Sequence, residues 1–132
     1  MGIISLIGEG LKSNIIRPKT PYKLTFAVTL HCNSRCKHCN IWQLQPKNEL
    51  NIEEIRNFAK ANPNFTIVEL TGGEPFLRSD IVDIAKAFSE YSKKLYAITL
   101  PTNSLVSSDL IVERIKEMLK LKKKIVLTLS LD

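Results

Sequence analysis

The chain has 132 residues, of which 44% are hydrophobic and 24% charged, so its composition is that of one folded domain rather than of a disordered chain. Its apolar runs fall well short of the roughly 20 residues that span a bilayer, and its N-terminus lacks a basic start followed by a small-residue cleavage site. We therefore expect a cytoplasmic protein with no membrane partner. The net charge is +6, but the densest lysine run, at residues 120–124, stands at an expected helix end without interleaved aromatic residues, so we do not expect nucleic acid as a partner.

Residues 1–20 differ in pattern from the rest of the chain. Apolar residues recur there every four positions, at Ile3, Ile7, Leu11 and Ile15. This spacing predicts an amphipathic helical arm, which Pro18 and Pro21 would end. We favour an arm that packs against the domain. The alternative is a helix on a membrane surface, but its polar face would carry only Glu9 and Lys12 as charges.

Residues 21–132 form the expected core domain, in which strands and helices alternate. Four apolar strands are expected, at residues 22–30, 65–70, 95–100 and 125–131. Three amphipathic helices separate them, with N-caps at Asn51, at Ser79 or Asp80, and at Ser107 or Ser108. Glu54 completes a capping box with Asn51, and Pro101 is expected to end the third strand. This order predicts an α/β fold of parallel strands joined by right-handed helical crossovers.

Three cysteines follow the first strand within eight residues, with the spacing C-x3-C-x2-C: Cys32, Cys36 and Cys39. An odd number of thiols so close together is not a disulfide framework. A structural zinc site would need His31 or His38 as its fourth ligand. Each histidine adjoins a cysteine in the sequence, and two neighbouring residues can hardly bind one small ion together with the other ligands. A four-iron cluster on three thiolates leaves one iron open to a small molecule. The pattern therefore favours such a cluster.

A second unusual segment, Gly72-Gly73-Glu74-Pro75, follows the second strand. Two glycines let the backbone approach a ligand closely. Glu74 adds a carboxylate, so the turn suits an ammonium group such as that of an amino acid. Alone, the segment would be an ordinary strand-to-helix turn. Because parallel strands end at the same edge of a sheet, it is expected beside the cysteine loop.

Together, the cysteine spacing and the Gly-Gly-Glu-Pro turn resemble those of the radical S-adenosylmethionine (radical SAM) enzymes. The resemblance covers about residues 21–132, and the sequence around the cysteines is similar to the branch of molybdenum-cofactor cyclases and peptide-modifying maturases. It implies a partial (βα) barrel. The family core usually has six βα units, so about four strands make a truncated radical SAM core, here preceded by the N-terminal helix.

The resemblance also implies an activity. Cys32, Cys36 and Cys39 would ligate three irons of a [4Fe–4S] cluster, and S-adenosyl-L-methionine (SAM) would chelate the fourth. The turn Gly72, Gly73, Glu74 and Pro75 would hold the methionine amino group. Reductive cleavage of SAM would give a 5′-deoxyadenosyl radical that abstracts hydrogen from an unknown substrate. An external low-potential electron donor, of the flavodoxin or ferredoxin type, would be the redox partner.

Other cofactor-binding positions follow from the resemblance alone. His38 stands where the family usually has an aromatic residue near adenine, and it could contact SAM through its ring or its backbone. The positions that match strand ends contacting SAM or substrate in relatives are Thr102, Asn103, Ser130 and Asp132. Ser104 replaces a glycine that many relatives have, which leaves the conformation of that turn open. Trp42 is expected to pack over the cluster loop. No catalytic side chain is assigned.

The chain carries only part of the family core, so we expect an enzyme by resemblance but no substrate turnover from these 132 residues alone. Two alternatives stay open: a non-catalytic remnant that serves as an interaction module, and a zinc-binding module. The last expected strand is apolar throughout and has no following helix, which predicts pairing with another chain. We favour association with a second copy over cover by the arm; a missing C-terminal half would also bury this edge.

Overall fold

The computed structural model describes residues 4, 7, 8, 10, 11, 15 and 21–130. In this part of the chain, four strands form one sheet in the order β1-β2-β3-β4, and every neighbouring pair is parallel. The strands are β1 (Lys23–Thr29), β2 (Ile67–Gly72), β3 (Ala97–Thr102) and β4 (Lys124–Leu129). The predicted α/β class and the four parallel strands are confirmed, with β2 and β3 each lying two residues later than expected.

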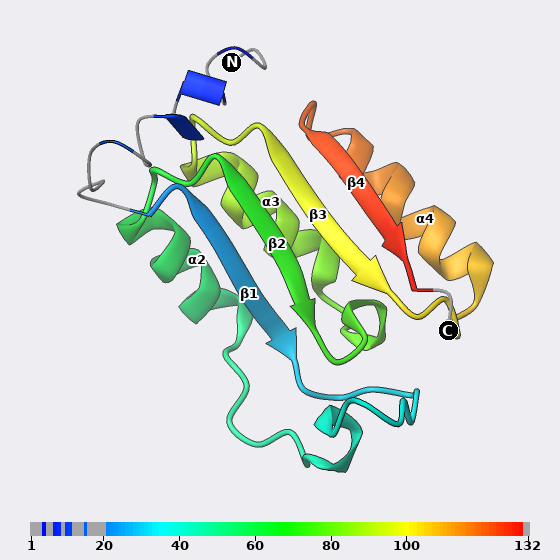
Figure 1. Ribbon diagram of the computed structural model, residues 1–132. Coiled ribbons are helices and arrows are strands. Elements are labelled where there is room, and N and C mark those ends of the chain that lie inside the picture. The colour runs from blue at the N-terminus through cyan, green and yellow to red at the C-terminus, as the bar shows by residue number, and fades with distance from the viewer. Residues whose placement is uncertain (1–3, 5–6, 9, 12–14, 16–20, 131–132) are drawn as a thin grey trace.

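Three helices connect the strands and lie on one face of the sheet (Figure 1). They are α2 (Ile52–Ala61), α3 (Ile81–Tyr91) and α4 (Ser108–Leu119). Two short 3-10 helices, Ile41–Gln43 and Pro75–Leu77, interrupt the loops after β1 and β2. Within residues 21–130, the other face of the sheet carries no helix (Figure 1). The loops that follow the strands gather at one edge, which is where a parallel sheet places a functional site.

The hydrophobic core fills the space between the sheet and the helices. Alternate residues of the central strands point into it, among them Leu70 and Ile98, and they meet Ile55, Ile84 and Phe88 of the helices, all fully buried. Each such buried side chain stabilises the fold by about 1.5–3 kcal/mol. This packing holds the strands whose ends carry the loops that follow them.

The helix starts were predicted correctly, but their caps differ. Asn51 forms the complete capping box of α2, since its side chain accepts from Glu53 N and Glu54 N at 3.0 Å and its backbone N donates to Glu54 at 2.8 Å. Asp80 and Ser107 precede α3 and α4 without a side-chain cap hydrogen bond. The carboxylate of Asp80 instead accepts hydrogen bonds from the guanidinium of Arg78.

Pro101 does not end the third strand as expected; it lies inside β3, paired with Thr128 of β4. Proline lacks the N–H that a strand interior normally donates. The ladder between β2 and β3 ends at Thr99, so no neighbour on that side requires this N–H. The proline is therefore tolerated within a strand.

Most of the predicted N-terminal arm lies outside the described residues, and so does Asp132. Of the expected apolar stripe, Ile7, Leu11 and Ile15 are described and are exposed. How the arm is placed stays a prediction. Among the described residues, no helix combines the length and apolar character that crossing a membrane would require.

Candidate SAM and iron–sulfur site

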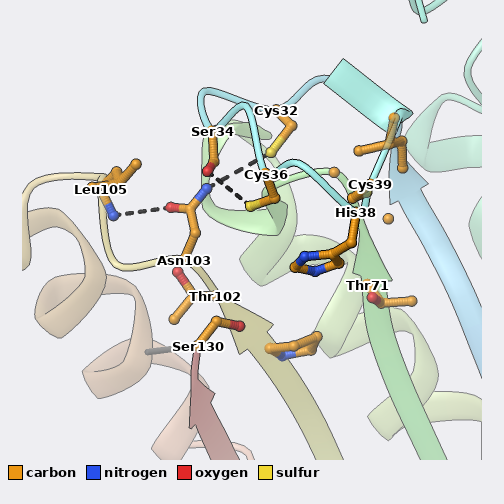
Figure 2. A pocket seen from close by; sticks show the side chains of 14 residues that line it. Cys32, Ser34, Cys36, His38, Cys39, Thr71, Thr102, Asn103, Leu105 and Ser130 are labelled. Carbon is orange, nitrogen blue, oxygen red and sulfur yellow. Dashed lines mark hydrogen bonds between the residues drawn. The ribbon is translucent and has the colours of Figure 1, made fainter. Parts of the chain in front are cut away.

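A cavity of about 500 Å³ lies where the cysteine loop meets the carboxyl ends of β2, β3 and β4. All three cysteines line it, and so does His38 from the same loop. The strand ends contribute predicted residues as well: Gly72, Gly73, Thr102, Asn103 and Ser130. Figure 2 shows the labelled side chains of the loop facing those of β3 and β4 across the cavity. The structure thus brings most of the predicted site residues together.

The three cysteines are half-buried, and all of them line the cavity. Cys39 N donates to the carbonyl of Cys36 at 3.1 Å, which closes a turn between the second and third cysteine. Ser34 Oγ lies 3.1 Å from Cys36 Sγ. Among the described residues, no three Cys, His, Asp or Glu side chains converge closely enough to hold a single metal ion. A four-iron cluster requires less convergence, because each thiolate binds a different iron.

The two glycines serve the fold in a way the sequence did not reveal. A Cβ on Gly72, whose φ is 121°, would lie 2.1 Å from Thr29 O, and a Cβ on Gly73 would lie 2.1 Å from His31 O. Two hydrogen bonds use this closeness: Gly73 N donates to Thr29 O at 2.7 Å, and Glu74 N donates to His31 O at 2.8 Å. The glycines therefore let the start of the cysteine loop lie directly on the turn.

Glu74 is 1% exposed and, like the buried Pro75, does not line the cavity. Its Oε1 accepts from Phe76 N at 3.1 Å and from Thr102 Oγ1 at 2.9 Å, while Oε2 accepts from Asn103 N at 2.8 Å. The carboxylate thus joins the ends of β2 and β3. A direct contact of Glu74 or Pro75 with a ligand stays a prediction.

Asn103 connects the end of β3 to the cysteine loop. Its Nδ2 donates to Asn33 Oδ1 at 2.9 Å. The same Nδ2 lies 3.7 Å from Cys32 Sγ, and Asn103 Oδ1 accepts from Leu105 N at 2.9 Å (Figure 2). Ser104 adopts a φ of 60°, a left-handed conformation that glycine would adopt at less cost. Its backbone N donates to Thr102 Oγ1 at 3.1 Å, which supports this turn.

The remaining predicted residues occupy different places. Ser130 lines the cavity, and its backbone N donates to Thr102 O at 2.9 Å. Trp42 lies outside the cavity lining; its ring packs 5.6 Å from the Arg35 guanidinium of the same loop, which agrees with the expected packing over that loop. Asp132 lies outside the described residues, so its place at the site stays a prediction.

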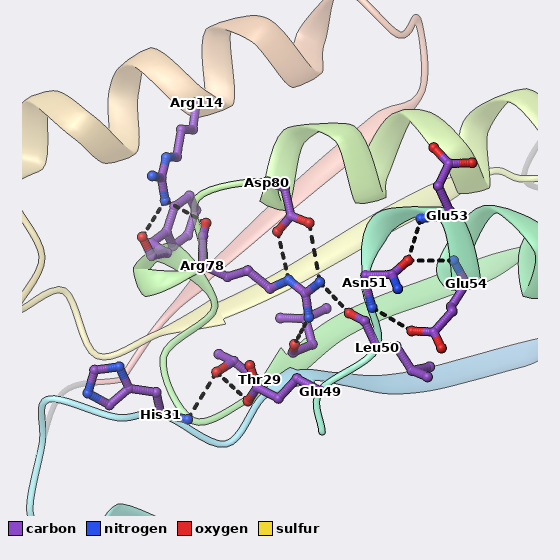
Figure 3. A network of polar contacts seen from close by, with 12 residues as sticks. Thr29, His31, Glu49, Leu50, Asn51, Glu53, Glu54, Arg78, Asp80 and Arg114 are labelled. Atoms are coloured by element: carbon purple, nitrogen blue, oxygen red, sulfur yellow. Dashed lines mark hydrogen bonds and ion pairs between the residues drawn. The ribbon is translucent and has the colours of Figure 1, made fainter. Parts of the chain in front are cut away.

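Sequence reasoning missed two residues that support the cysteine loop, Glu49 and Arg78. Both make several hydrogen bonds near the base of the loop, and neither lines the cavity (Figure 3). The available signal was an arginine two residues before an acidic residue, three positions after the last residue of the Gly-Gly-Glu-Pro turn. That pattern alone does not tell which backbone carbonyls the arginine reaches.

Comparison with known proteins identifies relatives of this chain. The chain is 37% identical over 86 residues to GTP 3',8-cyclase of Erythrobacter litoralis, covering 61% of this chain and 26% of that protein. It is 38% identical over 95 residues to Molybdenum cofactor biosynthesis protein 1 of Drosophila melanogaster, covering 67% and 17%. The chain thus spans about a quarter or less of these two relatives.

Solved structures give the same fold. Streptococcus suis SuiB, crystallised with S-adenosylmethionine, superposes with a TM-score of 0.65 and 26% identity over 94% of this chain and 28% of SuiB. BtrN in an open conformation superposes with a TM-score of 0.62 and 15% identity, over 83% of this chain and 56% of BtrN, and supports the fold alone. The family described as Radical SAM superfamily matches residues 26–132, and the chain therefore belongs to this enzyme superfamily.

Proposed function

We propose that residues 21–132 form the part of a radical SAM enzyme that binds a [4Fe–4S] cluster and SAM. The observation that carries the proposal is the common cavity: three cysteines of one loop and the ends of three parallel strands line the same space of about 500 Å³. Membership of the superfamily and the likeness to SuiB, which was solved with SAM, support it.

The donor set fits a cluster that leaves one iron without a protein ligand. Cys32, Cys36 and Cys39 would each bind one iron, and the described part of the chain contains no further cysteine. Together, the cluster and SAM would supply a 5′-deoxyadenosyl radical for hydrogen abstraction from a substrate. An electron donor of the flavodoxin or ferredoxin type is the expected partner.

The chain's own groups would bind and orient SAM. Gly72 and Gly73 present backbone without side chains to the cavity, the imidazole of His38 provides a wall, and Thr102, Asn103 and Ser130 add polar groups at the opposite side. The Asn103 amide near Cys32 would donate to a cluster-bound sulfur, an interaction that tunes the reduction potential of iron–sulfur sites.

The substrate of this chain does not follow from its relatives. The relatives named GTP 3',8-cyclase are matched over a quarter to a third of their length, so we propose radical chemistry of this class without assigning GTP as the substrate. We do not expect turnover from the 132-residue chain alone. A non-catalytic remnant and a zinc module are the alternatives that the experiment below must separate.

Anaerobic reconstitution of the full chain tests the proposal. Wild type should take up about four irons and four sulfides per chain, and SAM should change the electron paramagnetic resonance (EPR) signal of the reduced cluster. Cys36→Ser should abolish the cluster, whereas Lys37→Ser, at an exposed position of the same loop outside the cavity lining, should retain it.

Three results would contradict the proposal in different ways. Zinc in place of iron, at one ion per chain, would support the zinc module. A reduced cluster whose EPR signal does not change when SAM is added would indicate a non-catalytic remnant that binds the cluster but not SAM. Full iron content with an unchanged spectrum in Cys36→Ser would show that the cysteines do not hold the metal.

A further inference from the structure

The cysteine-bearing loop, residues 30–50, is positioned with little help from hydrophobic packing. Its only regular element is the short 3-10 helix Ile41–Gln43, and none of its residues is fully buried. A loop of this length is costly to hold in one conformation. Polar contacts at its base must therefore contribute to its placement, and Figure 3 shows where they lie.

Arg78 makes the first of these contacts. Its guanidinium donates to Val28 O, at the end of β1 just before the loop, and to Leu50 O, the last residue of the loop, at 2.6 Å. Asp80 holds the same guanidinium through bonds of 2.7 and 3.2 Å. The Arg78 side chain is 11% exposed. One planar group thus joins the two ends of the loop.

Glu49 makes the second contact from within the loop. Its Oε1 accepts from Thr29 Oγ1 at 2.8 Å and from Leu30 N at 2.7 Å. Thr29 Oγ1 in turn accepts from His31 N at 3.0 Å. This chain of hydrogen bonds runs from the end of the loop back to the residue that precedes Cys32.

The two contacts reinforce each other at the same point. Arg78 connects residues 28 and 50, and Glu49 connects to residues 29 and 30. The backbone of Arg78 is itself fixed, because Arg114 of α4 donates to Arg78 O at 3.0 Å. Neither Arg78 nor Glu49 lines the cysteine cavity, so any effect on the site must pass through the loop.

We propose that Arg78 and Glu49 form a clamp that closes the base of the cysteine loop and thereby sets the position of Cys32 and the cysteines after it. Both are positioning residues, and the inference rests on the proposed function in that the loop is taken to carry the cluster. Lysine cannot replace Arg78, because a single ammonium lacks the planar fork that reaches two carbonyls and a carboxylate together. Glutamine can partly replace Glu49, because its amide oxygen still accepts hydrogen bonds.

The test begins with the full chain free of iron, so that it does not depend on the cluster. Hydrogen exchange of residues 30–50 and the rate of thiol modification should rise about tenfold in Glu49→Ala and in Arg78→Lys, as expected when hydrogen bonds to charged groups are lost. Glu49→Gln should remain close to wild type. Arg56→Gln is the matched control, since Arg56 forms an exposed pair with Glu53 at 3.6 Å on α2.

The effect must be confined to the loop. Amides of β2 and β3 should exchange as in wild type, and anaerobic reconstitution of Glu49→Ala should give a lower cluster content and a broader EPR signal. Unchanged exchange and thiol reactivity of residues 30–50 in both Glu49→Ala and Arg78→Lys would overturn the clamp. The clamp would also be overturned if, in Glu49→Ala, the amides of the sheet exchanged faster by the same factor as those of residues 30–50. Glu49 is exposed, so its loss should not unfold the domain. If the wild-type chain takes up no iron, the proposed function is overturned. The clamp is then decided by hydrogen exchange and thiol modification of the iron-free chain.

Discussion

Gly73 illustrates how a single residue can serve a ligand site and the fold together. It lines the cavity, where a backbone without a side chain could approach a ligand, and it also lies against the carbonyl of His31, which precedes the first cysteine. The sequence suggested only the first role. A Val substitution intended to block a ligand would therefore also displace the cysteine loop, so ligand loss alone would not identify its cause.

We expect Gly73→Ala to lower the free energy of unfolding by about 1–3 kcal/mol, the usual cost of an added methyl group without space. The reason is the 2.1 Å separation between the new Cβ and His31 O. Urea unfolding of the iron-free chain measures the change. Gly8→Ala is the control, because a Cβ at Gly8 meets nothing within 4 Å and should not destabilise the chain. Wild-type stability in Gly73→Ala would mean that the loop does not lie against the turn.

At the scale of elements, Glu69 joins β1 to β2, and its position alternates with the buried Val68 and Leu70 of the same strand. Lys23 pairs with its carboxylate at 3.1 Å, and Thr25 Oγ1 donates to it at 3.0 Å. The hydrogen bond from Lys23 lowers the pKa of Glu69 most strongly, burial opposes this shift, and Thr25 adds to the lowering. The ionised carboxylate is thus the form that the fold favours.

A carboxylate whose pKa is lower in the folded state adds stability above its unfolded pKa, about 4.3, and loses this contribution as the pH falls through the folded value. We therefore expect Glu69→Gln to cost up to about 1 kcal/mol at pH 7, since the pair is partly exposed. The cost should shrink at about pH 4 and below. Urea unfolding at several pH values measures it. Glu90→Gln, the same exchange at an exposed site on α3, is the control and should cost little at pH 7. A cost for Glu69→Gln that stays constant with pH would contradict the assignment.

The elements also show which contacts a sequence can reveal. Asn51 and Glu54 are three residues apart, so the sequence alone predicts their capping box, and the structure contains it. The hydrogen bonds of Arg78 to the carbonyls of residues 28 and 50 could not be predicted from the sequence, because they depend on which strand ends lie side by side. The cysteine spacing and the strand order predicted the common cavity. The buried place of Glu74 could not be predicted, since local sequence does not give the direction of a side chain at a turn.

At the scale of the whole molecule, β4 forms one edge of the sheet, with only β3 paired to it in the described part of the chain. Leu127 and Leu129 of β4 are exposed, the latter by 54%, and α4 beside it exposes Val112 and Leu119. An apolar edge strand of this kind is a template for pairing with another chain. We propose that a second copy covers it, in preference to the N-terminal arm, because a closed symmetric contact satisfies both copies.

Light scattering over a range of concentrations tests this association. The wild-type chain should approach twice the mass of a monomer as its concentration rises, and removal of residues 1–20 should not prevent it. Leu129→Lys should restore the monomer, since a charge at an apolar edge opposes pairing. Leu44→Lys is the control, because Leu44 is equally exposed but lies in the cysteine loop rather than at the β4 edge. A monomer at every concentration, with and without the arm, would show that β4 does not pair with a second copy.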